Sequence, residues 1–223
     1  LGDVYKRQAV QSAVAVRWRE ITGTELVEGY GLTEASPVVC LNPVRNPRIG
    51  TVGLPVPSTE VAIRDDQGND LPIGEPGEIC VRGPQVMQGY WQRPDESSLV
   101  LTAGGWLHTG DIGAFDAQGY LKILDRKKDM INVSGFKVFP NEVEDIIAQH
   151  PGVLEAAVIG VADPHTGQGV KLFVVKRDPA LTEAELTTFA RERLAGYKVP
   201  KVIVFVDSLP KSNVGKIIRK DLR

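Results

Sequence analysis

The sequence predicts an α/β protein made of α+β pieces: a helix and a loop, a β-rich region, and a small domain of a three-stranded sheet with helices. Three observations predict this class. Apolar residues recur at helical spacing over residues 9–21, short alternating segments fill residues 49–126, and amphipathic and apolar stretches alternate after residue 138. A chain of 223 residues is long enough for one large domain or two small ones.

The N-terminal part begins with a predicted helix. In AVQSAVAVRWREI, the side chains of Val10, Val14 and Trp18 are spaced four residues apart, and Gly23 ends the pattern. We therefore expect a helix with one face toward a core. The next stretch, LVEGYGLTE, is typical of a short apolar strand that runs into a loop framed by glycines.

The β-rich region and the small domain follow. Turn-forming stretches such as DDQGND and GEPG separate the strands of the β-rich region, which are EVAIR, EICVR and YLKIL. In the small domain, Pro140 stands in the first turn of an amphipathic helix, and Thr182 and Glu185 form a capping box that begins a second helix. The three predicted strands of its sheet are VLEAAVIGVAD, VKLFVVKR and VIVFV.

Charge and cysteine usage exclude some classes of partner. The net charge of -2 and the pI of about 6.0 give no basic field, so electrostatics imply neither nucleic acid nor an anionic membrane. No apolar run reaches the roughly 18 residues of a membrane span. Cys40 and Cys80 fit no metal-binding spacing, which favours reduced thiols. We expect a cytoplasmic protein, and a peripheral position at the inner face of the membrane stays open.

The stretch EGYGLTEASP is the first that could carry chemistry. Gly29 and Gly31 flank Tyr30, so the backbone can approach a ligand closely while the ring lies against it. Thr33 and Glu34 place a hydroxyl beside a carboxylate, which suits a phosphate and the hard cation that a phosphate brings. The alternative is a glycine-rich turn capped by the threonine.

The stretch GGWLHTGDIG is the second. Asp111 follows Thr109 and Gly110 in a predicted tight turn, from which a carboxylate can accept two hydrogen bonds from a sugar diol. The alternative is a local Asx turn. His108 has no carboxylate or second histidine near it in the sequence, so we interpret it as a surface or packing residue. Arg126 offers a planar donor fork for phosphate or ribose oxygens, or else forms a surface ion pair.

The chain closes on LPKSNVGKIIRKDLR. This is not a Walker A loop, because no glycine stands five residues before Gly215 and no serine or threonine follows Lys216. Either the stretch is a solvated basic tail, or Lys216, pinned in a turn by Gly215, meets one particular anion. In the second interpretation Lys211, Arg219 and Lys220 remain solvated.

Taken together, six ordered stretches resemble the core motifs of the adenylate-forming superfamily, which contains acyl-CoA synthetases, luciferases and peptide-synthetase adenylation domains. They are EGYGLTE, GEICVRGPQVMQGYW, GWLHTGD, DRKKDMINVSGFKVFPNEVE, GYKVPK and PKSNVGK. Four stretches most resemble the bacterial long-chain-fatty-acid CoA ligases: GLPVPSTE, GPQVMQGYWQRPDE, NEVEDIIAQHPGV and GYKVPK. The resemblance covers the chain from Ala9 to Arg223.

The resemblance implies a ligase with a two-step reaction. A fatty carboxylate attacks the α-phosphate of ATP to give acyl-adenylate and pyrophosphate, and the thiol of CoA then attacks the acyl carbon and expels AMP. The implied partners are fatty acid, ATP and CoA, with Mg²⁺ as the metal and no nucleic acid. Two alternatives stay open: another adenylate-forming enzyme, such as a medium-chain or aryl acid CoA ligase or one that loads a carrier protein, and a non-catalytic docking module.

The resemblance also implies roles for residues of the nucleotide site. Tyr30 would pack against adenine, Thr33 would contact the α-phosphate, and Glu34 would ligate Mg²⁺. Asp111 would bind the ribose hydroxyls, with Arg126 beside them. The implied nucleotide-binding residues are Gly29, Tyr30, Gly31, Thr33, Asp111 and Arg126.

Three further roles follow from the resemblance. Lys216 matches the lysine that bridges the attacking carboxylate and the phosphate, so it joins Thr33 and Glu34 as an implied catalytic residue. Lys128 matches the hinge position at which a small domain pivots between the two half-reactions. Ser134 and Gly135 form the implied CoA-side loop, with Gly135 close to pantetheine.

The implied domains are the C-terminal part of a large AMP-binding domain (9–125), a charged hinge linker (126–137) and a small mobile domain (138–223). Residues 1–8, LGDVYKRQ, resemble the translation of a sequencing-library transposon adaptor, so we expect them not to be native. The superfamily's Ser/Thr/Gly-rich phosphate loop belongs upstream of Ala9. We therefore expect a fragment that has no ligase activity alone.

Overall fold

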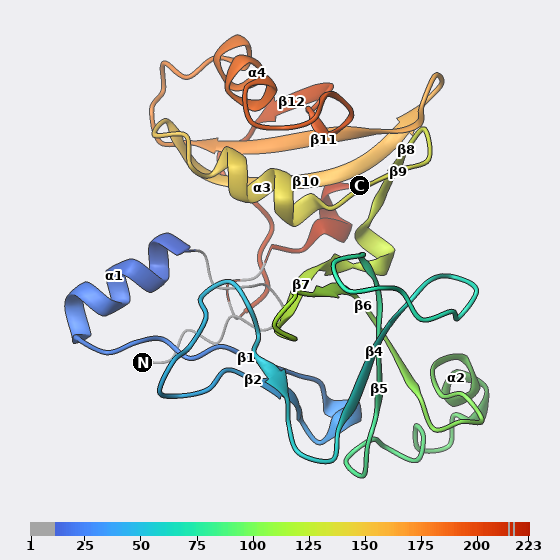
Figure 1. Cartoon of the computed structure of the whole chain (residues 1–223). Helices are drawn as coiled ribbons and strands as arrows, with labels where there is room; N and C mark the ends of the chain where they lie inside the picture. The colour runs from blue at the N-terminus through green and yellow to red at the C-terminus, as the bar shows by residue number, and fades with distance from the viewer. Residues whose placement is uncertain (1–11, 214, 216) are drawn as a thin grey trace. The chain divides into compact units, whose positions relative to one another are not determined.

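A computed structural model of the chain describes residues 12–213, 215 and 217–223 (Figure 1). These residues form two compact units, and the division falls between Lys127 and Lys128. We call them the N-terminal unit (12–127) and the C-terminal unit (128 onward). Each combines helices with antiparallel strands around its own apolar core, so the predicted α/β class is confirmed.

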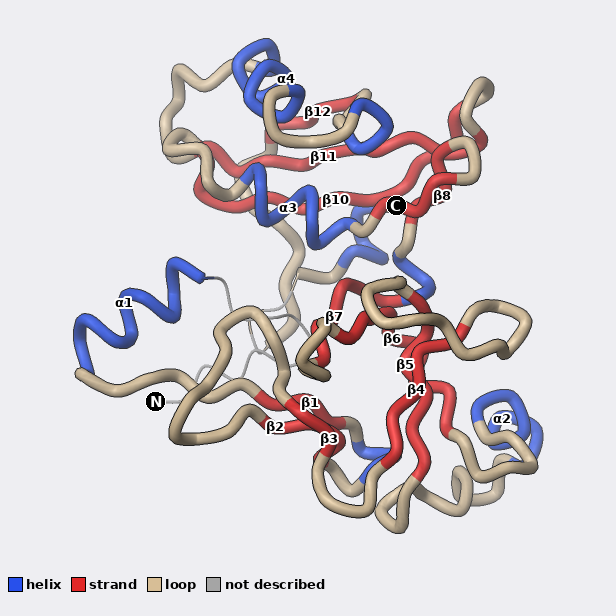
Figure 2. The backbone as a smooth tube through the Cα atoms, viewed as in Figure 1, coloured by secondary structure: helices blue, strands red, loops and turns tan. Residues whose placement is uncertain are grey.

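The N-terminal unit contains two helices and two antiparallel sheets (Figure 2). The helices are α1 (Ser12–Thr22) and α2 (Pro94–Val100). The first sheet is β1 (Gly29–Gly31), β2 (Val38–Leu41) and β3 (Leu54–Pro55). The second is β4 (Glu60–Arg64), β5 (Gly77–Arg82), β6 (Leu107–Phe115) and β7 (Leu121–Arg126), in that order. The three predicted strands are β4, β5 and β7.

Two helical features of this unit differ from the prediction. The prediction that Val14 and Trp18 face the core is wrong, because their side chains are 39% and 44% exposed and Ala15 is buried instead. Val10, the third residue of that predicted face, lies outside the described residues. Helix α2 was missed, although Pro94 at its start and the acidic Asp95 after it are typical signals of a helix N-terminus.

The C-terminal unit is built on a five-stranded sheet, so the prediction of a three-stranded sheet was wrong by two strands. Strand β11 (Gly167–Lys176) pairs with β10 (Val153–Asp163) on one side and with β12 (Val202–Phe205) on the other. These are the three predicted strands. The extra two, β8 (Ile131–Val133) and β9 (Phe136–Val138), form a hairpin inside the segment predicted as an irregular linker.

The two predicted helices of the C-terminal unit cover one face of its sheet (Figure 1). They are α3 (Pro140–Ile147) and α4 (Glu183–Arg191), and the predicted capping box of α4 is present. Buried Val143 and Leu186 from these helices join Val158 and Leu172 of the sheet in one core. The opposite face is covered by the C-terminal segment, from which Leu209 is buried against it.

Both cysteines are buried free thiols of the N-terminal unit, as the sequence predicted. Burial raises the pKa of Cys40 to about 12. Burial, followed by the nearby charge of Glu78, raises the pKa of Cys80 to about 12. Neither thiol is therefore poised as a nucleophile. Along the described part of the chain, no helix has the length and apolarity to cross a membrane.

Candidate functional site

Three predicted nucleotide-site residues meet in the N-terminal unit. The hydroxyl of Tyr30 donates to Oδ2 of Asp111 at 2.7 Å, and Nε of Arg126 lies 3.6 Å from Oδ1 of the same carboxylate. Tyr30 and Asp111 are 4% and 5% exposed, whereas the Arg126 side chain is 30% exposed. The structure thus brings together residues that are up to 96 positions apart, since 126 − 30 = 96.

Asp111 lies in a bulged strand, so the prediction of a tight turn was wrong. Thr109, Gly110 and Asp111 all lie inside β6, opposite the single residue Ile79 of β5. Gly110 has φ +69°, a conformation that glycine adopts without strain. The Thr109 hydroxyl donates to the carbonyl of Ile79 at 2.8 Å and accepts from the Asp111 amide at 3.1 Å.

A second bulge sets which residue faces Asp111. Strands β6 and β7 pair Gly113 with Ile123, but one step further they pair Ile112 with Asp125. Strand β7 therefore contains one extra residue, Leu124, at this point. Beyond it, Asp111 pairs with Arg126. The bulge thus gives the carboxylate a cationic cross-strand neighbour.

The glycines around Tyr30 have a reason within the fold. A Cβ built on Gly31 would lie 2.0 Å from the carbonyl oxygen of Pro37, because β1 and β2 approach closely there. On Gly29 it would lie 3.2 Å from the carbonyl oxygen of Cys40. The close backbone approach that we predicted toward a ligand is thus, for Gly31, an approach between two strands.

Thr33 and Glu34 lie in a one-turn 3₁₀ helix, Thr33–Ala35. Thr33 is exposed, and Glu34 is half-buried with Oε1 accepting from the Tyr90 hydroxyl at 2.9 Å. Both Glu34 and Tyr90 line a pocket of about 190 Å³. Among the described residues no group of three or more His, Cys, Asp or Glu side chains could hold a metal by itself.

Sequence reasoning misjudged His108, which does have a carboxylate beside it. Its Nδ1 lies 3.2 Å from Oε2 of Glu78, which is 7% exposed, and both residues line the same pocket as Glu34. The same Glu78 oxygen accepts from Nζ of Lys127 at 3.0 Å. Hydrogen bonds to Asp66 and then Glu78 raise the pKa of Lys127. Glu78 is 30 residues away in the sequence, so no local signal announced the contact.

The predicted CoA-side loop is the turn of the β8–β9 hairpin. Ser134 and Gly135 have φ of 51° and 87°, the pattern of a two-residue type I′ turn. A Cβ on Gly135 would meet no other atom within 4 Å, so packing inside the unit does not demand glycine there. Lys128, the predicted hinge residue, is exposed and lies in the 3₁₀ turn Lys127–Asp129.

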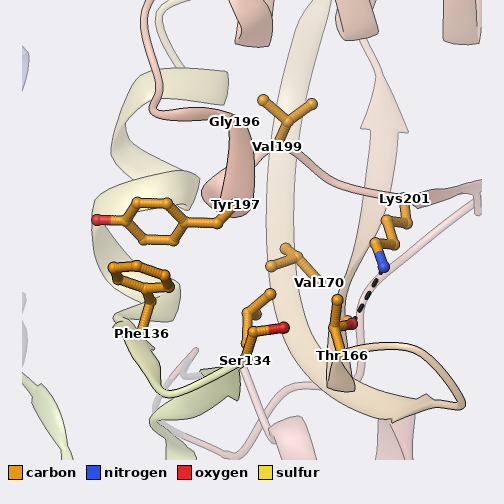
Figure 3. Close-up of a pocket in the computed structure, with 10 residues that line it drawn as sticks. Ser134, Phe136, Thr166, Val170, Gly196, Tyr197, Val199 and Lys201 are labelled. Atoms are coloured by element: carbon orange, nitrogen blue, oxygen red, sulfur yellow. Dashed lines mark hydrogen bonds between the residues drawn. The ribbon is translucent and has the colours of Figure 1, made fainter.

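A largely apolar pocket of about 250 Å³ lies beside this turn (Figure 3). Ser134 lines it at one side, and the rings of Phe136 and Tyr197 stack with centroids 4.8 Å apart. At the other side, Nζ of Lys201 donates to the Thr166 hydroxyl at 3.1 Å. The pocket thus combines two flat rings with one fixed cation.

Lys216 lies outside the described residues. Of the residues near it, Arg219 is not solvated, contrary to the prediction. Arg219 is 12% exposed and donates through Nη2 to Oε2 of Glu144 at 2.7 Å. Lys211 forms an ion pair with Glu155. Of the three charges expected to remain solvated, Arg219 is bound within the C-terminal unit, whereas Lys211 and Lys220 are exposed, as predicted.

Known proteins resemble the chain over most of its length. Two family profiles match it: "AMP-binding enzyme" over residues 6–91 and "AMP-binding enzyme C-terminal domain" over residues 142–216. The long-chain-fatty-acid–CoA ligase of Escherichia coli O6:H1 is 59% identical over 215 residues, which are 96% of this chain and 38% of that protein. The ligase of the same name from Bacillus subtilis is 46% identical over 96% of this chain and 39% of that protein.

A solved structure extends the likeness to the fold. ATP-bound MatB from Rhodopseudomonas palustris superposes with a TM-score of 0.90 at 36% identity, over 96% of this chain and 43% of that one. The chain therefore spans less than half the length of each of these proteins. Since both profiles match in order and the relatives match along 96% of its residues, the chain belongs to the adenylate-forming family of AMP-binding enzymes.

Proposed function

We propose that this chain is the C-terminal part of a long-chain-fatty-acid CoA ligase, which joins a fatty acid to CoA with the cleavage of ATP to AMP and pyrophosphate. The observation that carries the proposal is the meeting of Tyr30, Asp111 and Arg126, which come from three separate motifs. The 59% identity to the Escherichia coli ligase supports the choice of substrate. Fatty acid, ATP and CoA are the proposed partners, met in the cytoplasm or at the inner face of the membrane.

In this proposal Asp111 binds the ribose. A carboxylate can accept hydrogen bonds from both hydroxyls of a sugar diol, and Tyr30 holds the Asp111 carboxylate in one orientation. Arg126 keeps a positive charge beside the nucleotide, and Tyr30 contributes the ring predicted to meet adenine. Gly29 and Gly31 allow the strand that carries Tyr30 to lie close to its neighbour.

We assign Mg²⁺ to Glu34. Mg²⁺ is usually held by one or two carboxylates together with substrate phosphates and water, so a single carboxylate fits a metal that arrives with ATP. Glu34 is half-buried at a pocket, with Oε1 oriented by Tyr90. Thr33, exposed beside it, would donate to the α-phosphate. When bound, the metal would neutralise phosphate charge during adenylation.

Adenylation requires two anions to approach each other, so positive charge must be placed where they meet. We assign this role to Lys216. Removal of one preorganised donor of this kind typically costs about 3 kcal/mol, or about a hundredfold in rate. Lys128 is the proposed pivot that lets a different surface serve the second half-reaction.

We assign the CoA side to the C-terminal unit. The turn Ser134-Gly135 would lie along pantetheine, since the space beside Gly135 is open. The adjoining pocket supports this, because stacked Phe136 and Tyr197 suit a flat ring and Lys201 suits an anion. A thiolate nucleophile would then reach the acyl carbon while AMP leaves.

The test is a ligase in which residues 9–223 are joined to the upstream portion of the Escherichia coli O6:H1 relative. Supplied with ATP, oleate and CoA, it should form oleoyl-CoA, whereas the 223-residue chain alone should form none. Lys216→Ala should slow adenylate formation by about a hundredfold. Lys220→Ala, four residues further along the same tail, is the matched control and should change little.

Three outcomes would contradict the proposal. A folded hybrid that makes the adenylate but transfers nothing to free CoA would indicate an enzyme that loads a carrier protein. A Lys216→Ala variant with intact adenylation but failed partner binding would favour a docking role for the C-terminal unit. Oleoyl-CoA formed by the purified 223-residue chain would show that no upstream phosphate loop is required.

A further inference from the structure

The hairpin that carries the Ser134-Gly135 turn is poorly supported by the sheet. Strand β8 meets β11 at one pair only, Val133 with Gly167. Strand β9 pairs with β8 alone among the described strands. A two-stranded hairpin by itself is marginally stable in water, so the position of this turn depends on contacts from outside the ladder.

Hydrogen bonds from the β10–β11 hairpin supply that support. The side-chain carbonyl of Gln168 accepts from the backbone amide of Asn132 at 2.7 Å. The side-chain carbonyl of Asn132 in turn accepts from the Gly135 amide at 2.8 Å. The Ser134 amide donates to the carbonyl of Thr166 at 2.9 Å. Gln168 therefore accepts the hydrogen bond that a backbone carbonyl would accept in a longer ladder. Asn132, which Gln168 holds, in turn holds the amide of Gly135.

The hairpin that carries Gln168 is itself well anchored. Oδ1 of Asp163 accepts from the Thr166 hydroxyl at 2.8 Å and from the His165 amide at 3.0 Å. Oδ2 of Asp163 accepts from Nζ of Lys201 at 2.8 Å. Hydrogen bonds from Lys201 and then Thr166 hold the pKa of Asp163 well below its usual range, so the anchor is ionised at neutral pH.

Gln168 acts on the pocket without touching it. Ser134 and Thr166 line the pocket of about 250 Å³, and Gln168 does not. Core packing of Val133 and stacking of Phe136 on Tyr197 hold the two strands, whereas a Cβ on Gly135 would meet nothing within 4 Å, so the hydrogen bonds are the contacts that reach the turn itself. We propose that Gln168, through Asn132, is a positioning residue for the CoA-side turn; this inference rests on the proposed function.

The experiment compares Gln168→Leu with Gln168→Glu, which keeps a carbonyl acceptor. Gln149→Leu is the matched control, because this exposed glutamine of the same unit makes no side-chain hydrogen bond in the described structure. Amide hydrogen exchange of the 223-residue chain reports on the turn. In Gln168→Leu, the amides of Asn132 and Gly135 should exchange about fivefold faster, and those of β10 should not change.

The second measurement uses the hybrid ligase and separates the half-reactions. Gln168→Leu should raise the KM for CoA about fivefold and leave adenylate formation from ATP and oleate unchanged. Gln168→Glu should restore the KM. If Gln168→Leu fails to fold, as faster exchange throughout β10 would reveal, Asn132→Ala breaks the next link. It should speed exchange at Gly135 and raise the KM for CoA, while the backbone amide of residue 132 stays protected by Gln168.

The outcomes separate this inference from the proposed function. Unchanged exchange at Gly135 in Gln168→Leu would overturn it, because the turn would then be held by other contacts. Faster exchange with an unaltered KM for CoA would also overturn it and leave Gln168 with a structural role only. A hybrid ligase that never uses CoA would overturn the proposed function, whatever the exchange of Gly135.

Discussion

Asp111 in the N-terminal unit and Glu144 in the C-terminal unit are both buried carboxylates beside an arginine, yet their surroundings differ. Glu144 accepts from Nε and Nη2 of Arg219 at 3.1 and 2.7 Å, and also from the amide of Val158 at 2.7 Å. Asp111 lies 3.6 Å from its arginine, which remains 30% exposed. Both carboxylates are engaged on both oxygens, but Asp111 has the longer ion pair and the more exposed arginine.

We interpret this difference as one between a structural ion pair and a pair that is proposed to bind a ligand. Glu144 joins helix α3, strand β10 and the C-terminal segment, so its interactions hold elements of one unit together. In the proposed function the Asp111 carboxylate also accepts from the ribose hydroxyls, and its longer ion pair with Arg126 leaves more room for them than the tight pair of Glu144 does. Residue type and burial are alike in the two cases, and only the geometry distinguishes them.

The largest expected effect breaks the structural pair. Glu144→Ala would remove the nearer carboxylate of Arg219, 12% exposed, and leave Asp129 at 3.8 Å; removal of one partner of a buried pair typically costs about 3–5 kcal/mol. We expect urea denaturation to show a loss of this size in the C-terminal unit. Glu142→Ala, at an exposed position of the same helix, is the control. A loss below about 1 kcal/mol would show that Glu144 is no more than a surface-type pair.

The second effect breaks the binding pair. Asp111→Ala in the hybrid ligase should raise the KM for ATP by about ten- to a hundredfold, since hydrogen bonds to a charged group contribute about 1.5–3 kcal/mol. Asp95→Ala, at an exposed position of α2, should leave it unchanged. If Asp111→Ala destabilised the protein as much as Glu144→Ala does while the KM for ATP stayed constant, the two carboxylates would have to be regarded as alike.

A third, smaller effect tests the orientation of Asp111. Tyr30→Phe keeps the buried ring and removes the hydroxyl that donates to Oδ2 of Asp111. We expect a rise of about fivefold in the KM for ATP, with thermal unfolding little changed, because one hydrogen bond typically contributes about 1 kcal/mol. Tyr120→Phe, in the same unit, serves as the control. An unchanged KM would mean that Asp111 is oriented by its other neighbours.

The smallest effect at neutral pH concerns the two thiols of the N-terminal unit. Burial raises the pKa of Cys40 and of Cys80 to about 12. A raised folded-state pKa gives stability that is complete below the unfolded pKa of about 8.5 and is lost as the pH rises through the folded pKa. We therefore expect no reaction with a thiol reagent at pH 8 and a falling free energy of unfolding between about pH 9 and 12.

The thiols also serve as a reporter for the comparison. In Glu144→Ala, they should stay protected if the damage is confined to the C-terminal unit, and they should be labelled if it spreads. Rapid labelling of the unmodified chain at pH 8 would contradict the burial of Cys40 and Cys80.

Periodicity in the sequence was enough to predict several of the regular elements. The helices near Pro140 and Thr182 and the strands EVAIR and EICVR lie where the apolar spacing placed them. Strand β6 was hidden, because the composition Thr-Gly-Asp is typical of a turn and equally suits a bulge. A bulge is defined by its partner strand, which no local pattern reveals.

The same limit applies to the site. Motif order pointed to Tyr30, Asp111 and Arg126, which the structure brings together. The pairs Glu78–His108 and Asn132–Gln168 are separated by 30 and 36 residues and belong to different strands or turns. Side-chain hydrogen bonds between distant elements leave no trace in spacing, so such partners could be found only once the strand register was known.

The extra residue in β7 gives the site a dependence on strand register. If Leu124 were paired within the ladder, the pairing of Gly113 with Ile123 would continue in step, and Asp125 would stand opposite Asp111 in place of Arg126. A shift of the register by one residue, with no change in the sequence, would then set two carboxylates against each other. The sign of the charge that faces Asp111 is therefore decided by the position of a bulge as much as by the identity of the residues.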